Sequence, residues 1–245
     1  MIHRAWLAAF GAIAFAGAVA FSLVQPDGAI EPMRPPAERP TLALLTSLPL
    51  MFGESFGLDS GGSPALTRIE HRYNVQPIGV ADGASLAGKR LLLMAHPRAQ
   101  PATALVELDQ WVRGGGRVLL LADPKLDWPS QRPLGDKLRP PPAFADTGLL
   151  GHWGLTLSGP LADGPSEVKV GKMAILTATP GTLTSKGSCR ILGGGLVARC
   201  RIGRGMATVI ADADLLNARP SAADAEPIAA NLDLVLAELA RFERP

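Results

Sequence analysis

The stretch KRLLLMAHPRAQPATALVELDQWVRGGGRVLLLADP, Lys89 to Pro124, decides the fold class of this chain. Two apolar runs, Leu91 to Ala95 and Val118 to Ala122, have the length and composition of buried parallel strands. Between them, Pro101 to Arg113 carries apolar residues at helical spacing, and the glycine triplet Gly114 to Gly116 ends this helix. The sequence therefore predicts a strand–helix–strand unit of a parallel sheet.

Shorter patterns predict further elements on both sides of this unit. From Lys125 to about Leu150 the chain is rich in proline, and we expect a long surface excursion there. The remaining expected elements are strands at Leu42–Thr46, Val75–Ile78 and Ala207–Ala211, several short strands between Leu155 and Ile202, and helices at Ser63–Tyr73 and Pro227–Phe242.

This order of elements predicts an α/β fold with a doubly wound, mostly parallel sheet. A single domain is expected over residues 41–245, with a β-rich insertion at about 155–202. The chain has 245 residues, of which 47% are apolar, enough for one large core. The net charge is only +2 and aromatic residues make up 5%, without a basic stripe, so nucleic-acid binding is not expected.

The amino terminus has the features of a membrane or export signal. Ala5 to Val24 is a run of twenty residues without a charge, and Arg4 precedes it. A helix of that length spans a hydrocarbon core of about 30 Å, and the positive flank keeps its first end in the cytoplasm. Ala18 to Ala20 fits a cleavage site instead, but the run continues past it and favours an uncleaved anchor.

Both interpretations place the domain on the periplasmic or extracytoplasmic side of the inner membrane. Gln25 to Pro40 is a proline-rich linker that is expected to be extended. Cys189 and Cys200 flank Gly193 to Gly195 in CRILGGGLVARC, a pattern typical of a β-hairpin. A turn centred between Gly194 and Gly195 puts the two cysteines opposite each other, so we expect a disulfide, with two free buried thiols as the alternative.

The segments ELDQWVRGGGRVLLLADP and GRGMATVIADADLLN resemble the non-catalytic branch of the class I glutamine-amidotransferase-like fold, which is flavodoxin-like. More narrowly, the chain is similar to the ABC-type uncharacterised transport system domain of gliding-motility auxiliary proteins. The resemblance covers about Thr41 to Pro124 and Gly203 to Phe242, and Lys125 to Ile202 has no counterpart in it. It implies a membrane-tethered, exported-side partner of an ABC permease and its ATPase, without catalytic residues.

The residues that follow the predicted strands decide between binding and catalysis. A catalytic amidotransferase needs a Cys on a strained turn after a strand, but His96-Pro97 follows Leu91 to Ala95. One G-x-S-x-G match, Gly53 to Gly57, lies inside the loop Pro49 to Gly62 and not on a strand-to-helix turn, so it does not indicate a nucleophile elbow. The chain carries no cofactor motif, so no cofactor is expected. Thiol and serine catalysis are therefore not expected.

Four polar residues could converge past the strand ends: His96, Asp123, Asp212 and Asp214. Together they would suit a metal or an acid–base site. For the three aspartates, capping of local backbone groups is the simpler explanation, and for His96 it is a place at the entry to the following helix, because no known metal-ligand spacing is present. Asn217 and Asn231 have the same two interpretations.

A glycine-rich loop, Pro49 to Gly62, follows the first expected strand on the same edge. It carries Glu54 and Asp59 and could close over a small molecule or dock a partner. Three functions stay open from the sequence. The first is a membrane-anchored, non-catalytic accessory component of an envelope ABC-type transport system. The second is an envelope hydrolase that uses the strand-end carboxylates, with or without a metal. The third is an exported soluble binding protein.

Overall fold

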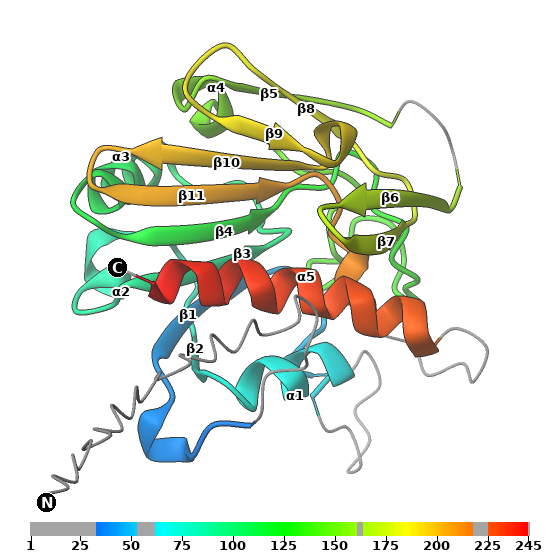
Figure 1. The fold of residues 1–245 in the computed structure, drawn as a ribbon, viewed down its shortest axis with the longest axis horizontal. Helices are drawn as coiled ribbons and strands as arrows, with labels where there is room; N and C mark the ends of the chain where they lie inside the picture. The colour runs from blue at the N-terminus through cyan, green and yellow to red at the C-terminus, as the bar shows by residue number, and fades with distance from the viewer. Residues whose placement is uncertain (1–32, 53–61, 161–163, 218–224, 245) are drawn as a thin grey trace, which may run out of the picture.

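The computed structural model describes residues 33–52, 62–160, 164–217 and 225–244 of the chain. They form a mixed α/β fold in which a central, mostly parallel sheet carries helices on both faces (Figure 1). None of the helices in these residues combines the length and the apolar character that crossing a bilayer requires. The apolar run Ala5 to Val24 lies outside the described residues.

The central sheet has seven strands in the order β2-β1-β3-β4-β11-β10-β9. The first five of these run parallel, and the last two join antiparallel. In that order the strands are Asn74–Pro77, Thr41–Thr46, Leu91–Ala95, Arg117–Leu121, Gly205–Ile210, Val197–Ile202 and Arg190–Leu192. The predicted parallel strands are thus confirmed to within one or two residues at each end.

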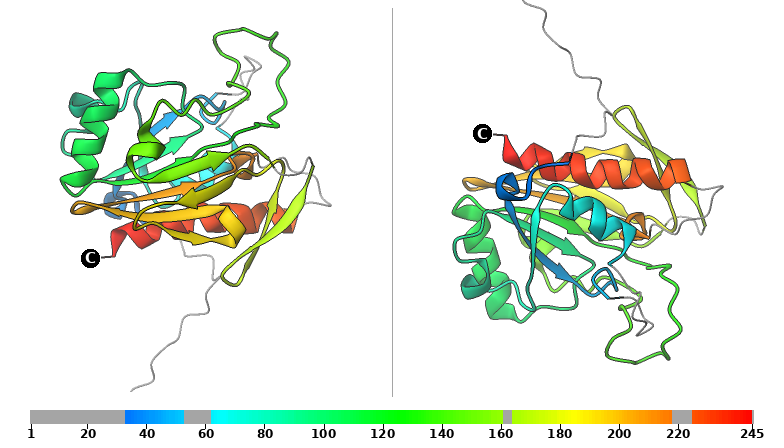
Figure 2. Two further views of the ribbon diagram at one scale, coloured as in Figure 1. Left: turned by 90° about the horizontal axis from the view of Figure 1, so that it is seen from above. Right: turned by 90° about the horizontal axis from the view of Figure 1, so that it is seen from below.

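Helices cover both faces of the sheet (Figure 2). On one face α1 (Pro64–Glu70) and α5 (Ala225–Glu243) pack against alternate strand residues. On the other face α2 (Gly83–Leu86) and α3 (Ala102–Arg113) form a second core cluster. All five residues of β3 are buried, which explains why its sequence is uniformly apolar and not alternating.

Local signals in the sequence set the helix ends. The hydroxyl of Ser63 accepts a hydrogen bond from the Leu66 N–H, 3.1 Å away, which caps α1 at its predicted start. Gly114 caps α3, as predicted. The end of α3 also lies against β11: a Cβ at Gly205 would stand 2.0 Å from the Val112 carbonyl oxygen, so only glycine fits there.

The β-rich region divides into three parts. β5 (Leu155–Ser158) pairs antiparallel with β8 (Thr182–Ser185), and β6 (Ser166–Val170) pairs with β7 (Met173–Thr177). β9 and β10 instead extend the central sheet, so the predicted insertion is partly a continuation of the main sheet. The short elements of the described chain are η1 (Pro36–Glu38), α4 (Leu149–His152), η2 (Gly193–Gly195) and η3 (Asp214–Leu216).

The last part of the predicted linker contacts the domain. The Arg34 N–H donates to the His71 carbonyl oxygen at 2.9 Å, and its guanidinium pairs with Glu243 of α5 at 2.8 Å. Pro36–Glu38 forms one turn of 3₁₀ helix rather than extended chain, and it buries no residue. The proline-rich segment is therefore held against the domain from Arg34 onward, which its composition did not predict.

Candidate functional site

The carboxyl ends of the parallel strands bring the predicted polar residues together. His96 directly follows β3, Asp123 follows β4 with one residue between, and Asp212 and Asp214 follow β11. One oxygen from each of the three carboxylates lies within 4.8 Å of the others. The convergence predicted from the sequence is thus present for the three aspartates, which we call the strand-end cluster.

Asp123 is fully buried and joins two strand connections. Its Oδ1 accepts a hydrogen bond from the Lys125 N–H at 2.9 Å, the local capping contact that the sequence predicted. Its Oδ2 accepts from the Ala213 N–H at 2.8 Å, across to the segment that follows β11. The carboxylate therefore stabilises two backbone donors that are far apart in sequence, and the one at Ala213 is buried.

The other two aspartates bind backbone groups in the same way. Asp212 accepts from the Leu215 N–H at 3.3 Å and from the Ala178 N–H at 3.2 Å. Asp214 accepts from the Asp127 N–H at 2.8 Å through Oδ2, while its buried Oδ1 has no hydrogen-bond partner among the described residues. Local capping was predicted for both residues. The structure shows it for Asp212, through Leu215, whereas the side chain of Asp214 contacts a distant segment instead.

Burial and mutual repulsion favour protonated carboxyl groups in this cluster. Burial raises the pKa of Asp123. Burial, together with the charges of Asp123 and Asp214, raises the pKa of Asp212 well above its ordinary value. Burial also raises the pKa of Asp214 to about 7, with the charges of Asp123 and Asp127 acting in the same direction. The three groups are therefore not all ionised at neutral pH.

His96 occupies a strained backbone position at the end of β3. Its φ of +47° makes it the one non-glycine residue with a positive φ in the described part of the chain. The ring is fully buried, and its Nε2 lies 2.9 Å from the Pro141 carbonyl oxygen, while its Nδ1 has no partner among the described residues. Burial lowers the pKa of this imidazole, although the Asp123 carboxylate opposes that shift. The following helix begins only at Ala102, so His96 is not a helix-entry residue.

The proline-rich excursion after Lys125 covers the strand ends. Besides the Pro141 contact, the Phe144 N–H donates to the Asp123 carbonyl oxygen at 2.6 Å. Leu126 and Trp128 pack against the buried core. The excursion is therefore a cover over the strand-end cluster, a role that no local sequence signal could have revealed.

The other candidate residues have different positions. Asn231 is buried in α5, where its side-chain amide donates to and accepts from the backbone of Leu176 and so pairs with the edge of β7. Asn217 ends η3, and its N–H donates to the Asp214 carbonyl oxygen at 2.8 Å. Glu54 and Asp59 lie outside the described residues.

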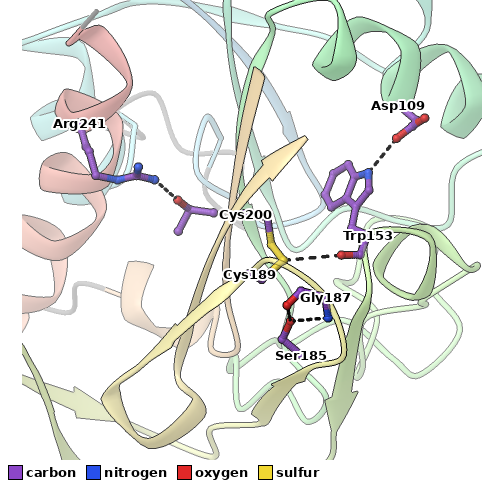
Figure 3. The surroundings of a disulfide bond; sticks show 8 residues. Asp109, Trp153, Ser185, Gly187, Cys189, Cys200 and Arg241 are labelled. Carbon is purple, nitrogen blue, oxygen red and sulfur yellow. Dashed lines mark hydrogen bonds between the residues drawn. A yellow bond between two sulfur atoms is a disulfide. The ribbon is translucent and has the colours of Figure 1, made fainter. Parts of the chain in front are cut away.

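The cysteine hairpin has the predicted register (Figure 3). Val197 pairs with Leu192 and Arg199 with Arg190, so the same register places Cys200 opposite Cys189. The two residues form a disulfide with a Cα–Cα distance of 4.2 Å. This bond ties β9, at the edge of the sheet, to β10.

Two surface hollows of the described residues lie away from the strand-end cluster. One, of about 400 Å³, is lined by the α2–β3 connection and the glycine triplet, including Lys89, Arg90 and Trp111. The other, of about 430 Å³, lies along the first half of α3. The cluster is therefore enclosed by the chain and does not line either hollow.

Comparison with solved structures shows the fold. The structure is similar to the exo-β-1,4-mannosidase Op5Man5 from Opitutaceae bacterium strain TAV5, with a TM-score of 0.51 and 16% identity. That match covers 82% of this chain but only 36% of the mannosidase. It is also similar to the mmIFT52 N-terminal domain, with a TM-score of 0.53 and 15% identity, covering 82% of this chain and 97% of that domain. No protein-family model and no curated protein matches the sequence.

Proposed function

We propose that this protein is a membrane-anchored, exported-side accessory component of an envelope ABC-type transport system, and that it acts by binding and not by catalysis. The backbone at the end of β3 carries the main support. In the amidotransferase-like fold that the sequence resembles, a nucleophile stands on a strained turn after a strand. Here the strained position, φ +47°, carries His96, which contacts the Pro141 carbonyl oxygen.

The hydrogen bonds of the strand-end cluster also support a structural role for these carboxylates. Each aspartate accepts at least one backbone N–H from the segments that surround it. A catalytic carboxylate must reach a substrate, whereas Asp123 and Asp212 are fully buried beneath the chain.

The order β2-β1-β3-β4-β11 of the parallel strands is in keeping with a flavodoxin-like, amidotransferase-like fold.

The proposed location has two lines of support. The disulfide between Cys189 and Cys200 suits an oxidising compartment outside the cytoplasm. The charge-free run from Ala5 to Val24, with Arg4 before it, suits a single-pass anchor that leaves the domain on that side. Both features are expected of a periplasmic domain tethered beside a membrane transporter.

The test is affinity purification of the full chain after gentle extraction from membranes, followed by quantitative mass spectrometry. We expect an ABC permease and its ATPase in amounts comparable to the protein itself. A matched control is the same protein with Ala5–Val24 replaced by a cleaved export signal, which should recover less of both. Recovery of neither subunit, together with a mature amino terminus near Phe21, would contradict the anchored role and favour an exported soluble binding protein.

The second candidate is an envelope hydrolase that uses the strand-end cluster. One observation favours it: the three aspartate oxygens lie within 4.8 Å, close enough to share a divalent cation. Calorimetric titration of the full chain with Mn²⁺ separates the two functions. The binding proposal predicts no heat that depends on Asp212. A metal-dependent hydrolase predicts saturable binding that Asp212→Asn abolishes and Asp146→Asn leaves intact.

A further inference from the structure

The amino ends of the parallel strands form an edge that is rich in cations. Figure 1 shows the carboxyl-terminal end of α5, the end of α3 and the turn between β10 and β11 at this edge. Six cationic side chains there have no carboxylate partner within the described residues, and we call them the amino-edge cations: Lys89, Arg90, Arg117, Arg201, Arg204 and Arg244.

Backbone contacts hold several of these residues close together. The Arg117 N–H donates to the Arg90 carbonyl oxygen at 3.0 Å, and the Arg117 guanidinium donates to the Arg244 carbonyl oxygen at 3.1 Å. The Arg204 N–H donates to the carbonyl oxygen of Arg113, at the end of α3. Burial lowers the pKa of Arg117, and the charges of Arg90 and Arg241 lower it further, as expected for crowded like charges.

The carboxylates near this edge are already engaged elsewhere. Glu238 pairs with Arg199 and Arg241, Asp109 with Arg113 and the Trp153 indole, and Glu243 with Arg34 and the Tyr73 hydroxyl. Glu107 and Asp82 accept backbone N–H groups of Gly83 and Ser85. These carboxylates reduce the positive field, but none of them forms an ion pair with an amino-edge cation. Four of the amino-edge cations are exposed: Arg90, Arg201, Arg204 and Arg244.

The same edge is hollowed. The depression of about 400 Å³ is lined by Lys89, Arg90 and the glycines from Gly114 to Gly116. The glycines add no side-chain bulk, so an anionic group in this hollow could approach the two cations closely. The hollow therefore suits a phosphate group, which arginine and lysine bind well.

The tether reaches the domain at this edge as well. β1 begins at Thr41 and runs parallel to β3, so the chain that leaves Pro40 joins the sheet at its amino edge. Arg34 is held by His71 and Glu243, which leaves only the nine residues Gln25 to Met33 between the apolar run and this contact. Nine residues span at most about 30 Å when fully extended. An anchor at Val24 would therefore keep the amino edge next to the bilayer.

We propose that the amino-edge cations dock the domain onto the anionic phospholipid headgroups of the membrane that anchors it, with a headgroup phosphate seated in the hollow beside Arg90. This inference rests on the membrane anchoring within the proposed function. It adds an orientation: the amino edge faces the bilayer, and the strand-end cluster with its proline-rich cover faces away. Each cation removed is expected to weaken docking about fivefold.

The test uses the purified full chain inserted in vesicles, without partner proteins, so that it is independent of partner recovery. The rate of arginine modification by phenylglyoxal, a neutral reagent, is followed by mass spectrometry. Vesicles of phosphatidylcholine alone are compared with vesicles that also contain phosphatidylglycerol. We expect Arg201 and Arg204 to react several-fold more slowly with the anionic lipid, and high salt to remove the difference. Arg98, exposed at the opposite edge, should react equally in both.

Charge-reversal variants give the matched comparison. In the double variant Arg90→Glu with Arg244→Glu, Arg201 and Arg204 should react at the same rate in both kinds of vesicle. Lys137→Glu with Lys169→Glu changes exposed lysines outside the amino edge by the same charge and should keep the protection. Equal rates in both lipids would overturn the proposal, as would protection of Arg98. Protection that arises only after an acidic protein is added would overturn it in favour of a protein partner.

Discussion

Asp123, at the end of β4, accepts a hydrogen bond from the N–H of Ala213, at the end of β11, over 2.8 Å in a fully buried site. The two strands are neighbours in the sheet, but the residues are 90 positions apart in sequence. The contact links the two segments that follow these strands, where main-chain groups no longer pair with a neighbouring strand. This carboxylate stands where a catalytic group would lie in such a fold, but it accepts hydrogen bonds from backbone N–H groups.

Replacing Asp123 with alanine should destabilise the domain. The change leaves the buried N–H of Ala213 and the N–H of Lys125 without their acceptor, and we expect a loss of about 2–4 kcal/mol in the free energy of unfolding. Denaturant unfolding of the domain provides the measurement. Asp146→Ala is the control, because Asp146 also accepts two backbone N–H groups but is exposed, and it should cost about 1 kcal/mol or less. Equal losses would contradict the buried structural role.

Asp214 should give the domain a distinctive dependence on pH. Its pKa is raised to about 7 in the folded state, so the folded protein holds a proton that the unfolded chain loses near pH 3.8. The stability from this proton is complete below that value and is lost as pH rises to about 7, a decline of about 2–4 kcal/mol. Asp123 and Asp212 act in the same direction, since burial raises their pKa values too.

His96 acts in the opposite direction. The pKa of its imidazole is lowered, so its contribution to stability is present above pH 6.5 and is lost as pH falls through the pKa of the folded state.

Asp214→Asn should flatten the decline in stability between about pH 4 and 7, and Asp146→Asn should not. The free energy of unfolding at several pH values gives the comparison, and an unchanged slope in Asp214→Asn would show that this carboxyl is not the source.

The backbone strain at His96 predicts an unusual order of stabilities. His96→Gly and His96→Val both lose the contact with the Pro141 carbonyl oxygen. Both residues must adopt a φ of +47° at this position. That conformation is unfavourable only for the β-branched valine, so His96→Val should be less stable by about 1–2 kcal/mol. Thermal unfolding of both variants decides this. A valine variant as stable as the glycine variant would mean that the left-handed backbone is not required there.

The disulfide is expected to contribute to stability rather than to activity. It closes a loop between residues separated by 11 positions, for which the loss on removal is about 3 kcal/mol. Cys189→Ser with Cys200→Ser should lower the melting temperature, and addition of a thiol reductant should have no effect on that variant. If the wild type melts at the same temperature with and without reductant, the bond does not stabilise the folded state.

Local sequence patterns predicted the features that depend on residues close together in the sequence. The uniformly apolar run Leu91 to Ala95 matches β3 because a strand buried on both faces needs no polar residue. The cysteine pairing followed from symmetry, since Cys189 and Cys200 are equally distant from the centre of the glycine turn. The three aspartates were predicted to converge because parallel strands end at one edge.

Contacts between distant segments were not predictable in this way. Nothing near Pro141 in sequence indicates that its carbonyl meets His96, 45 residues earlier. The proline-rich segment from Lys125 reads as a surface excursion, and only the fold shows that it covers the strand ends. The cations of the amino edge are scattered along the sequence, from Lys89 to Arg244, and the sheet topology alone brings them to one side.

The most direct test of the central claim compares partner recovery by the wild type and by Asp214→Asn, both as full chains extracted from membranes. A binding role in which the strand-end carboxylates are structural predicts that both recover an ABC permease and its ATPase in equal amounts. If neither chain recovers these subunits, and the wild type alone shows hydrolytic activity toward an envelope substrate, the account is contradicted and the strand-end cluster is catalytic.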